Sequence, residues 1–210
     1  MIDDGKDQPQ VRYRRQIEKY PIDFERSFVV MEKKVLVAFA TTHGATQEVA
    51  EEVAAVLRDH GYEVEVQPAR AVKSLAGCGA VVLGASLYMM HMHKDAARFL
   101  SRHKRAFNEG LPFAIFAGGP FDKADAAVWA EVRKRLDGDL ANYPWLKPIS
   151  TLVIGGKFDP TGLRFPWNLL PALKQMSSSD LRDWQAIRAW AGSLAEQMAT
   201  GPLDLPTTIA

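Results

Sequence analysis

The chain is poor in cysteine, with Cys78 as the only one among 210 residues. A single thiol excludes an internal disulfide and any Cys-x-x-Cys metal or redox motif. Long hydrophobic runs are missing too: no segment approaches the roughly 20 apolar residues of a membrane-spanning helix, and no secretory signal core opens the sequence. We therefore expect a cytoplasmic protein without a transmembrane segment.

An excess of charge of either sign is also lacking, because 26 basic residues face 25 acidic ones for a net charge of +1. Nucleic-acid-binding proteins usually carry a basic excess, so we expect no nucleic-acid partner. The 47% of hydrophobic and 24% of charged residues are typical of a folded globular protein. The length favours one domain with appendages.

The two ends of the sequence differ from its middle. Residues 1–30 are polar and show no sustained periodicity, which predicts an N-terminal arm. Met31 stands just before the first apolar run and is a candidate translation start, which would leave the arm untranslated. Residues 200–210 contain two prolines and predict a frayed tail. The predicted domain therefore spans residues 31–199.

Within the domain, short apolar runs alternate with longer segments of helical periodicity, a pattern typical of a parallel sheet covered on both faces. The predicted strands are Val35–Ala40, Tyr62–Val66, Ala80–Ala85, Phe113–Ala117 and Ile149–Ile154. The predicted helices begin after Thr46 and end near Gly61, cover Lys94–Phe107 and Ala124–Leu136, and open last at Ser179–Asp180, where Asp183 complements exposed amides. The sequence thus predicts an α/β doubly wound sheet of five parallel strands.

The junction between the first strand and the first helix has the composition of a phosphate-binding turn. It reads Thr41, Thr42, His43, Gly44, Ala45 and Thr46. A helix start offers unpaired N–H groups and partial positive charge, threonine hydroxyls add donors, and Gly44 lets the backbone come close to a ligand. The turn contains no lysine or arginine, so neutral donors would hold the phosphate. Ordinary helix capping is the alternative.

Ligands of doubly wound sheets bind at the carboxyl ends of the strands, where the strand order reverses. The loops after the first, third and fourth strands are expected to meet there. They contain residues 41–46, residues 86–93 with Tyr88 and the methionine pair Met89-Met90, and residues 118–121 with two glycines and Phe121. Flat aromatic and flexible side chains suit a planar ring. These loops therefore predict a flavin site.

The segment Ala-Thr-Thr-His-Gly-Ala-Thr at 40–46 resembles the FMN phosphate loop of the flavodoxins, with His43 in place of the usual threonine. Further stretches are similar to the menaquinone-dependent protoporphyrinogen oxidases of bacterial haem synthesis. They are Val-Leu-Gly-Ala-Ser-Leu-Tyr-Met-Met-His-Met-His (82–93), Val-Ile-Gly-Gly-Lys-Phe (153–158), Arg-Phe-Pro-Trp (164–167) and Asp-Trp (183–184). The resemblance covers roughly residues 33–198.

This resemblance implies a flavodoxin-like fold with strand order 2-1-3-4-5, an insertion after strand five at 157–178, and FMN as cofactor. It implies an oxidoreductase that takes hydrogen from a porphyrinogen and passes electrons to a quinone, with no metal. The residues matched to FMN are Thr41, Thr42, His43, Gly44, Ala45 and Thr46 for the phosphate, and Ala85, Ser86, Leu87, Tyr88, Gly118, Gly119, Pro120 and Phe121 for the ring. His91 is a candidate proton carrier, since imidazole titrates near neutral pH.

Two interpretations of the insertion at 157–178 remain open. Its apolar residues, interspersed with lysine and arginine, would suit peripheral contact with the inner face of the membrane, close to quinone. They would equally suit packing over the protein's own sheet. The family's counterpart is richer in arginine and tyrosine.

Other functions also remain open at this point. A flavodoxin-type electron carrier would use the same FMN site without a small-molecule substrate, although such carriers generally present an acidic docking face. A sensor or scaffold without cofactor is the third class. His91 and His93 form a weak candidate metal pair, because no third ligand is near in sequence. The sequence does not settle whether the protein forms homo-oligomers.

Overall fold

A computed structural model describes residues 34–88, 91–119, 125–162, 169 and 177–200. The predicted arm at 1–30, nearly all of the predicted tail and most of the insertion lie outside these residues. Pro120 and Phe121, both assigned to the flavin site, lie outside them as well. Among the described residues, no helix is long and apolar enough to cross a membrane.

The centre of the molecule is a parallel sheet of five strands. They are β1 (Lys34–Ala40), β2 (Glu63–Pro68), β3 (Ala80–Tyr88), β5 (Phe113–Gly118) and β6 (Ser150–Ile154). Their spatial order is β2-β1-β3-β5-β6, and a short strand β4 (His91–Met92) pairs antiparallel with the end of β3. Counting the parallel strands alone, this is the predicted order 2-1-3-4-5, which confirms the fold class.

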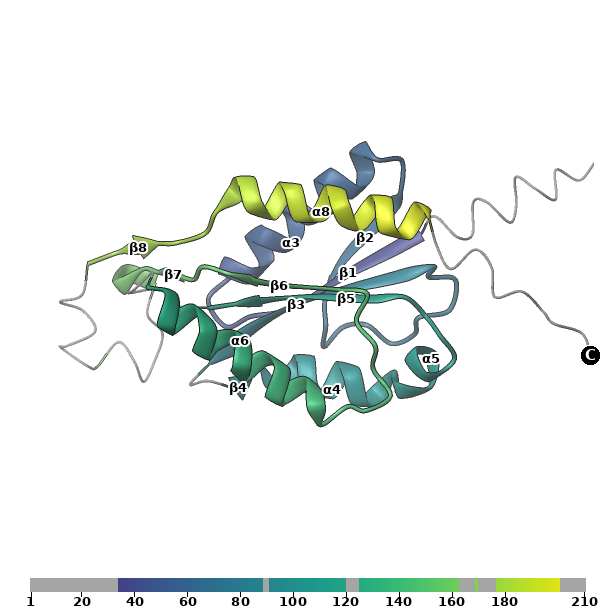
Figure 1. Ribbon diagram of the computed structural model, residues 1–210, viewed down its shortest axis with the longest axis horizontal. Coiled ribbons are helices and arrows are strands. Elements are labelled where there is room, and N and C mark those ends of the chain that lie inside the picture. Colours follow the sequence, from purple (N-terminus) through teal and green to yellow (C-terminus); the bar gives the residue numbers. More distant parts are fainter. Residues whose placement is uncertain (1–33, 89–90, 120–124, 163–168, 170–176, 201–210) are drawn as a thin grey trace, which may run out of the picture.

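Helices cover both faces of the sheet (Figure 1). The helices α3 (Ala45–Asp59) and α8 (Trp184–Ala199) lie on one face. The helices α4 (Lys94–Arg102), α5 (Lys104–Asn108) and α6 (Ala126–Ala141) lie on the other. The chain thus forms three layers, and both faces of the sheet are covered.

The two-sided burial follows from the alternation of side chains along each strand. On β1, Val35 and Val37 belong to the core cluster under α3 and α8, whereas Leu36 and Ala38 belong to the cluster under α4 and α6. All four are buried. A strand buried on both faces needs a continuous apolar sequence, and that is why the strands were recognisable from sequence.

The predicted helix at Lys94–Phe107 is two helices, interrupted at His103. The apolar spacing continues through the break, since Phe99, Leu100 and Phe107 are all buried in one cluster. Side-chain periodicity reports which face is buried and not whether every backbone hydrogen bond is kept. The interruption was therefore invisible in the pattern.

The start of the last helix was also predicted wrongly. Ser179–Asp180 forms the short strand β8, which pairs antiparallel with β7 (Lys157–Phe158), and a 3-10 turn, η1 (Pro160–Gly162), follows β7. Helix α8 begins at Trp184, and the Asp183 carboxylate accepts a hydrogen bond of 2.9 Å from the amide of Ala186. The capping role predicted for Asp183 is confirmed, whereas the polar pair before it belongs to a hairpin.

Candidate functional site

The loop between β1 and α3 is a tight turn in which Gly44 adopts the left-handed backbone conformation, with φ at 89°. The Gly44 amide donates a hydrogen bond of 3.1 Å to the Thr41 hydroxyl oxygen. A Cβ built on Gly44 would meet no atom within 4 Å, so the space above the turn is open. The glycine is needed for its backbone angle, because side chains rarely tolerate this conformation.

Helix α3 begins directly after Gly44 with no side-chain cap. The carbonyl of Gly44 accepts a hydrogen bond of 2.9 Å from the Gln47 amide, which closes the first turn. Four amides find no acceptor in the described part of the chain: those of Thr42, His43, Ala45 and Thr46. A helix start with unpaired donors and partial positive charge suits an anion.

The donor chemistry of this loop fits the phosphate of FMN. The Thr41 hydroxyl accepts from Gly44 and keeps its own proton for donation. Thr42 and His43 are exposed, whereas Thr46 is 4% exposed and lies in the first turn of α3. Neutral hydroxyl and amide donors around a helix start are sufficient to bind a phosphate. The residues predicted from sequence for the phosphate are thus together in one turn.

The ends of β3 and β5 lie next to this loop. Strand β3 is the neighbour of β1 and pairs on its other side with β5, so that Ser86 is opposite Gly118. Ser86 and Leu87 are partly exposed, but Ala85 is fully buried in the core. The described starts of the three loops therefore lie together at the carboxyl ends of β1, β3 and β5. The Ala85 side chain presents no surface there.

Gly119 is fixed by the neighbouring strand β6. Its amide donates a hydrogen bond of 2.7 Å to the carbonyl of Ile154, and a Cβ built on it would lie 2.9 Å from that oxygen. The backbone of this loop thus starts at a defined position beside β6. Tyr88 is the last residue of β3. The ring contacts predicted for Tyr88, Pro120 and Phe121 stay predictions.

His91 lies on the side of the molecule covered by α6. Its side chain is 69% exposed, its Nε2 atom lies 2.8 Å from Nη2 of Arg135, and its Nδ1 atom lies 3.9 Å from the Asp139 carboxylate. Asp139 also accepts a hydrogen bond of 2.8 Å from the Met92 amide, which holds β4 against α6. The His91 ring thus lies on the surface of α6, in contact with Arg135 and Asp139. Its role as a proton carrier stays a prediction.

His93 has a structural task that the sequence pattern did not reveal. Its Nδ1 atom accepts a hydrogen bond of 3.2 Å from the Asp95 amide and caps α4. Burial lowers the pKa of His93, although the charge of Asp95 opposes this shift. A neutral ring keeps the lone pair that the cap requires. Among the described residues, no group of three potential metal ligands occurs.

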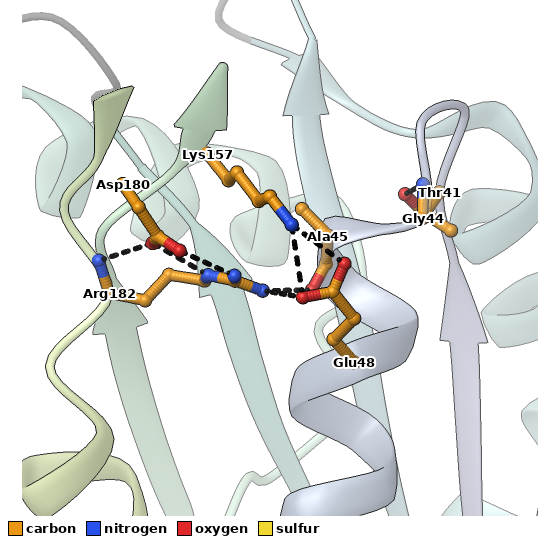
Figure 2. Close-up of polar contacts among 7 residues, drawn as sticks. All are labelled: Thr41, Gly44, Ala45, Glu48, Lys157, Asp180 and Arg182. Atoms are coloured by element: carbon orange, nitrogen blue, oxygen red, sulfur yellow. Dashed lines mark hydrogen bonds and ion pairs between the residues drawn. The ribbon is translucent and has the colours of Figure 1, made fainter. Parts of the chain in front are cut away.

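A cluster of charged side chains beside the phosphate loop, at the first turn of α3, was missed in the sequence (Figure 2). It joins Glu48 in the first turn of α3, Lys157 in β7, and Asp180 and Arg182 at the end of the β7–β8 hairpin. From the sequence, Lys157 was assigned only to the insertion at 157–178. Arg182 is separated from Glu48 by 134 positions, so no local pattern joins them.

Comparison with solved structures identifies the fold. Flavodoxin 2 from Bacillus cereus superposes with a TM-score of 0.50 and 17% identity over 80% of this chain and 98% of that protein. A flavodoxin variant from Pseudomonas aeruginosa gives 0.50 and 13% over 80% and 99%. Rubredoxin:oxygen oxidoreductase from Desulfovibrio gigas gives 0.50 and 15% over 80% of this chain, which spans 36% of that larger protein.

These identities are low, so the structural likeness establishes the fold alone. No curated protein sequence matches the chain. The sequence model of the flavodoxin domain, however, matches residues 36–166, which is more than half of the chain and includes the phosphate loop and the strand ends beside it. This chain therefore belongs to the flavodoxin domain family and is an FMN-binding protein.

Proposed function

We propose that this chain is an FMN-dependent oxidoreductase that oxidises protoporphyrinogen IX and passes the electrons to a quinone. Bound FMN supplies the electron transfer, and the protein supplies binding and orientation. In this proposal, Thr41, Gly44 and Thr46 hold the phosphate, while Ser86 to Tyr88 and the loop from Gly118 to Phe121 bind the ring. The resemblance of residues 82–93 and 153–158 to the quinone-linked protoporphyrinogen oxidases supports it.

One structural observation carries the proposal: the base of the insertion is bonded to the helix that starts at the phosphate loop. Lys157, the first residue of the insertion and of β7, contacts the Glu48 carboxylate in the first turn of α3 at 3.1 Å. The β7–β8 hairpin therefore lies beside the start of α3, next to the proposed FMN site.

The test is an oxidation assay on FMN-loaded protein. Anaerobically prepared protoporphyrinogen IX is mixed with the protein and menadione, and porphyrin fluorescence is followed against a blank without protein. We expect porphyrin to form at a rate proportional to protein concentration. The alternative, a flavodoxin-type carrier, predicts FMN that is reduced and reoxidised by protein partners while porphyrinogen stays unconsumed, and this result would refute the enzyme.

His91 is the proposed proton carrier in this reaction, and its exposed position lets one substitution test it. A His91→Gln variant keeps a polar side chain beside Arg135 and removes the titratable ring. If His91 carries a proton, turnover with porphyrinogen falls by about 10²-fold or more, whereas FMN affinity is unchanged. Unchanged turnover would remove His91 from the mechanism.

Peripheral membrane contact through residues 157–178 belongs to the same proposal. The single described residue in the middle of the insertion, Leu169, has a side chain that is 66% exposed. An exposed leucine in a segment whose sequence also contains lysine and arginine suits a membrane interface. Co-sedimentation with vesicles containing anionic lipid, compared with a Leu169→Ser variant, tests this contact: equal recovery of both proteins in the pellet would count against it.

A further inference from the structure

The guanidinium of Arg182 is buried at the start of α3, with its side chain only 2% exposed. Its Nε and Nη2 atoms donate hydrogen bonds of 2.8 and 2.6 Å to the Asp180 carboxylate, and Nη1 donates one of 2.8 Å to Glu48. Nη1 also lies 3.3 Å from the carbonyl of Ala45, the first residue of α3 (Figure 2). One cation thus holds the hairpin and the helix start together.

The position of Arg182 is fixed by the backbone on which it stands. The amide of Leu181 donates a hydrogen bond of 3.0 Å to the carbonyl of Gly156, and a Cβ built on Gly155 would lie 1.8 Å from the Leu181 carbonyl oxygen. The segment before α8 is therefore in close contact with the residues that follow β6. The ring of Trp184 lies 4.6 Å from the guanidinium carbon on another side.

A second cation reaches the same carboxylate. Nζ of Lys157 lies 3.1 and 3.3 Å from the two carboxylate oxygens of Glu48. Burial alone would raise the pKa of Glu48, but the hydrogen bonds from Arg182 and Lys157 outweigh it and lower that pKa. Glu48 is therefore ionised at neutral pH. One of its cationic partners, Lys157, is the first residue of the insertion, and the other, Arg182, follows the insertion directly after β8 and Leu181.

An ionised Glu48 creates an electrostatic problem for an anion at the same helix start. A carboxylate in the first turn is favourable for an isolated helix, but it repels a phosphate bound at that terminus. The phosphate loop itself, residues 41–46, has no lysine or arginine to compensate. The compensating charges nearest to Glu48 are those of Arg182 and Lys157.

We propose that Arg182, assisted by Lys157, is a positioning residue for the FMN phosphate: it neutralises Glu48 and fixes the first turn of α3. This inference depends on the proposed placement of the phosphate at residues 41–46. It gives the insertion a role in cofactor binding, because both cations flank that segment. The affinity for FMN would then depend on whether the β7–β8 hairpin keeps Arg182 and Lys157 in contact with Glu48.

The test compares FMN with riboflavin, which has the same ring and no phosphate. Apoprotein is titrated with each ligand, and binding is followed by quenching of flavin fluorescence. In an Arg182→Gln variant we expect the Kd for FMN to rise about tenfold, because Glu48 then keeps only Lys157 as a cationic partner, and the Kd for riboflavin to change less than about twofold. Adding Glu48→Gln to the same variant removes the repulsion and should restore most of the FMN affinity.

A matched control lies further along α3. Arg188 of α8 pairs with Glu52 of α3 at 2.9 Å, an ion pair to the same helix as the Arg182–Glu48 pair but beyond its first turn. An Arg188→Gln variant should leave the Kd values of both ligands unchanged. Should Arg182→Gln fail to fold, Lys157→Met serves instead, since Lys157 is 36% exposed. The Lys157→Met variant should raise the Kd for FMN by about two- to threefold, and by less at high salt.

The outcomes separate the inference from its premise. An equal loss of FMN and riboflavin affinity in Arg182→Gln, or no recovery with Glu48→Gln, would show a merely structural role and overturn the inference. Wild-type protein that binds riboflavin as tightly as FMN would instead refute the placement of the phosphate, and the inference with it. The wild type is expected to bind FMN more tightly than riboflavin. If Arg182→Gln loses this preference and the added Glu48→Gln restores it, the placement of the phosphate and the role of Arg182 are both supported.

Discussion

At the scale of single residues, the two glycines that decide the site do so for different reasons. Gly44 is needed for a backbone angle, since φ is 89° and the space around a Cβ is open. Gly155 is needed for space, since a Cβ would collide with the Leu181 carbonyl. Substitution by alanine should therefore affect cofactor binding at the first position and the fold at the second.

The Gly44→Ala variant tests the first reason. A left-handed alanine costs about 1–2 kcal/mol, so the turn should relax and its amides should lose their common orientation. We expect the Kd for FMN to rise about tenfold or more in a fluorescence titration. Gly110→Ala is the matched control, because Gly110 has φ at 96° and equally open space but lies in the loop before β5. It should lower stability similarly and leave FMN affinity unchanged.

The Gly155→Ala variant tests the second reason. The added methyl cannot fit 1.8 Å from a carbonyl oxygen, so the segment at Leu181 must move, at a cost of about 1–3 kcal/mol in the free energy of unfolding. Gly138→Ala, in the interior of α6 with no atom within 4 Å, should instead stabilise the protein by about 0.5–1 kcal/mol. Urea unfolding of both variants measures the difference. Equal effects would contradict the steric explanation.

Contacts between single residues were the part of the site that sequence could not predict. The phosphate loop is local, so its residues were recognisable from their order alone. Arg182 and Glu48 meet only because the hairpin returns to α3, and neither residue carries a sign of this in its neighbourhood. His93 likewise looked like a candidate ligand until its cap to the Asp95 amide was visible.

At the scale of elements, capping decides where the last helix begins. The Asp183 carboxylate accepts a hydrogen bond from the Ala186 amide, and this bond sets the start of α8 at Trp184, two residues after Arg182. The strands β1, β3, β5 and β6 were predicted from their apolar runs, and β2 from its alternation of polar and apolar residues. The break between α4 and α5 was not, because the buried face runs through it, and the β7–β8 hairpin was missed because two-residue strands leave no periodicity.

Replacing the cap gives a prediction for α8. Asp183→Ala should lower the free energy of unfolding by about 0.5–2 kcal/mol, because the first amides of the helix lose an acceptor. Asp183→Asn keeps an acceptor at the same place and removes only the charge, so it should lose much less. The urea midpoints of the two variants are the measurement. A loss of the same size in both would mean that the charge of Asp183, and not the cap, is what matters.

At the scale of the whole molecule, the charge cluster makes stability depend on pH. Hydrogen bonds from Arg182 lower the pKa of Asp180, and those from Arg182 and Lys157 lower that of Glu48 against the effect of burial. A carboxylate whose pKa is lower in the folded state stabilises the fold above its unfolded pKa and loses this effect as pH falls through the folded pKa. The cluster therefore contributes fully at neutral pH and is lost in acid.

We expect the free energy of unfolding to fall as the pH is lowered from about 5 to about 3. Because Glu48 and Asp180 are 48% and 40% exposed, solvent screening limits the loss to about 1 kcal/mol or less for each. Urea unfolding at several pH values measures it. The Arg182→Gln variant should show a flatter profile over this interval, and a profile parallel to the wild type would assign the acid sensitivity to other groups.

The antiparallel pairing of Lys157 with Asp180 has a consequence for how such a protein can diversify. Strand β7 leads into the insertion and β8 follows it, and the two strands are paired at one place on the domain. The stretch between them can therefore be lengthened, shortened or exchanged without altering the path of the main sheet. We therefore expect both natural differences in length and grafted segments to be tolerated at this position. A variant in which a short turn joins β7 directly to β8 would be a suitable parent protein for such chimeras.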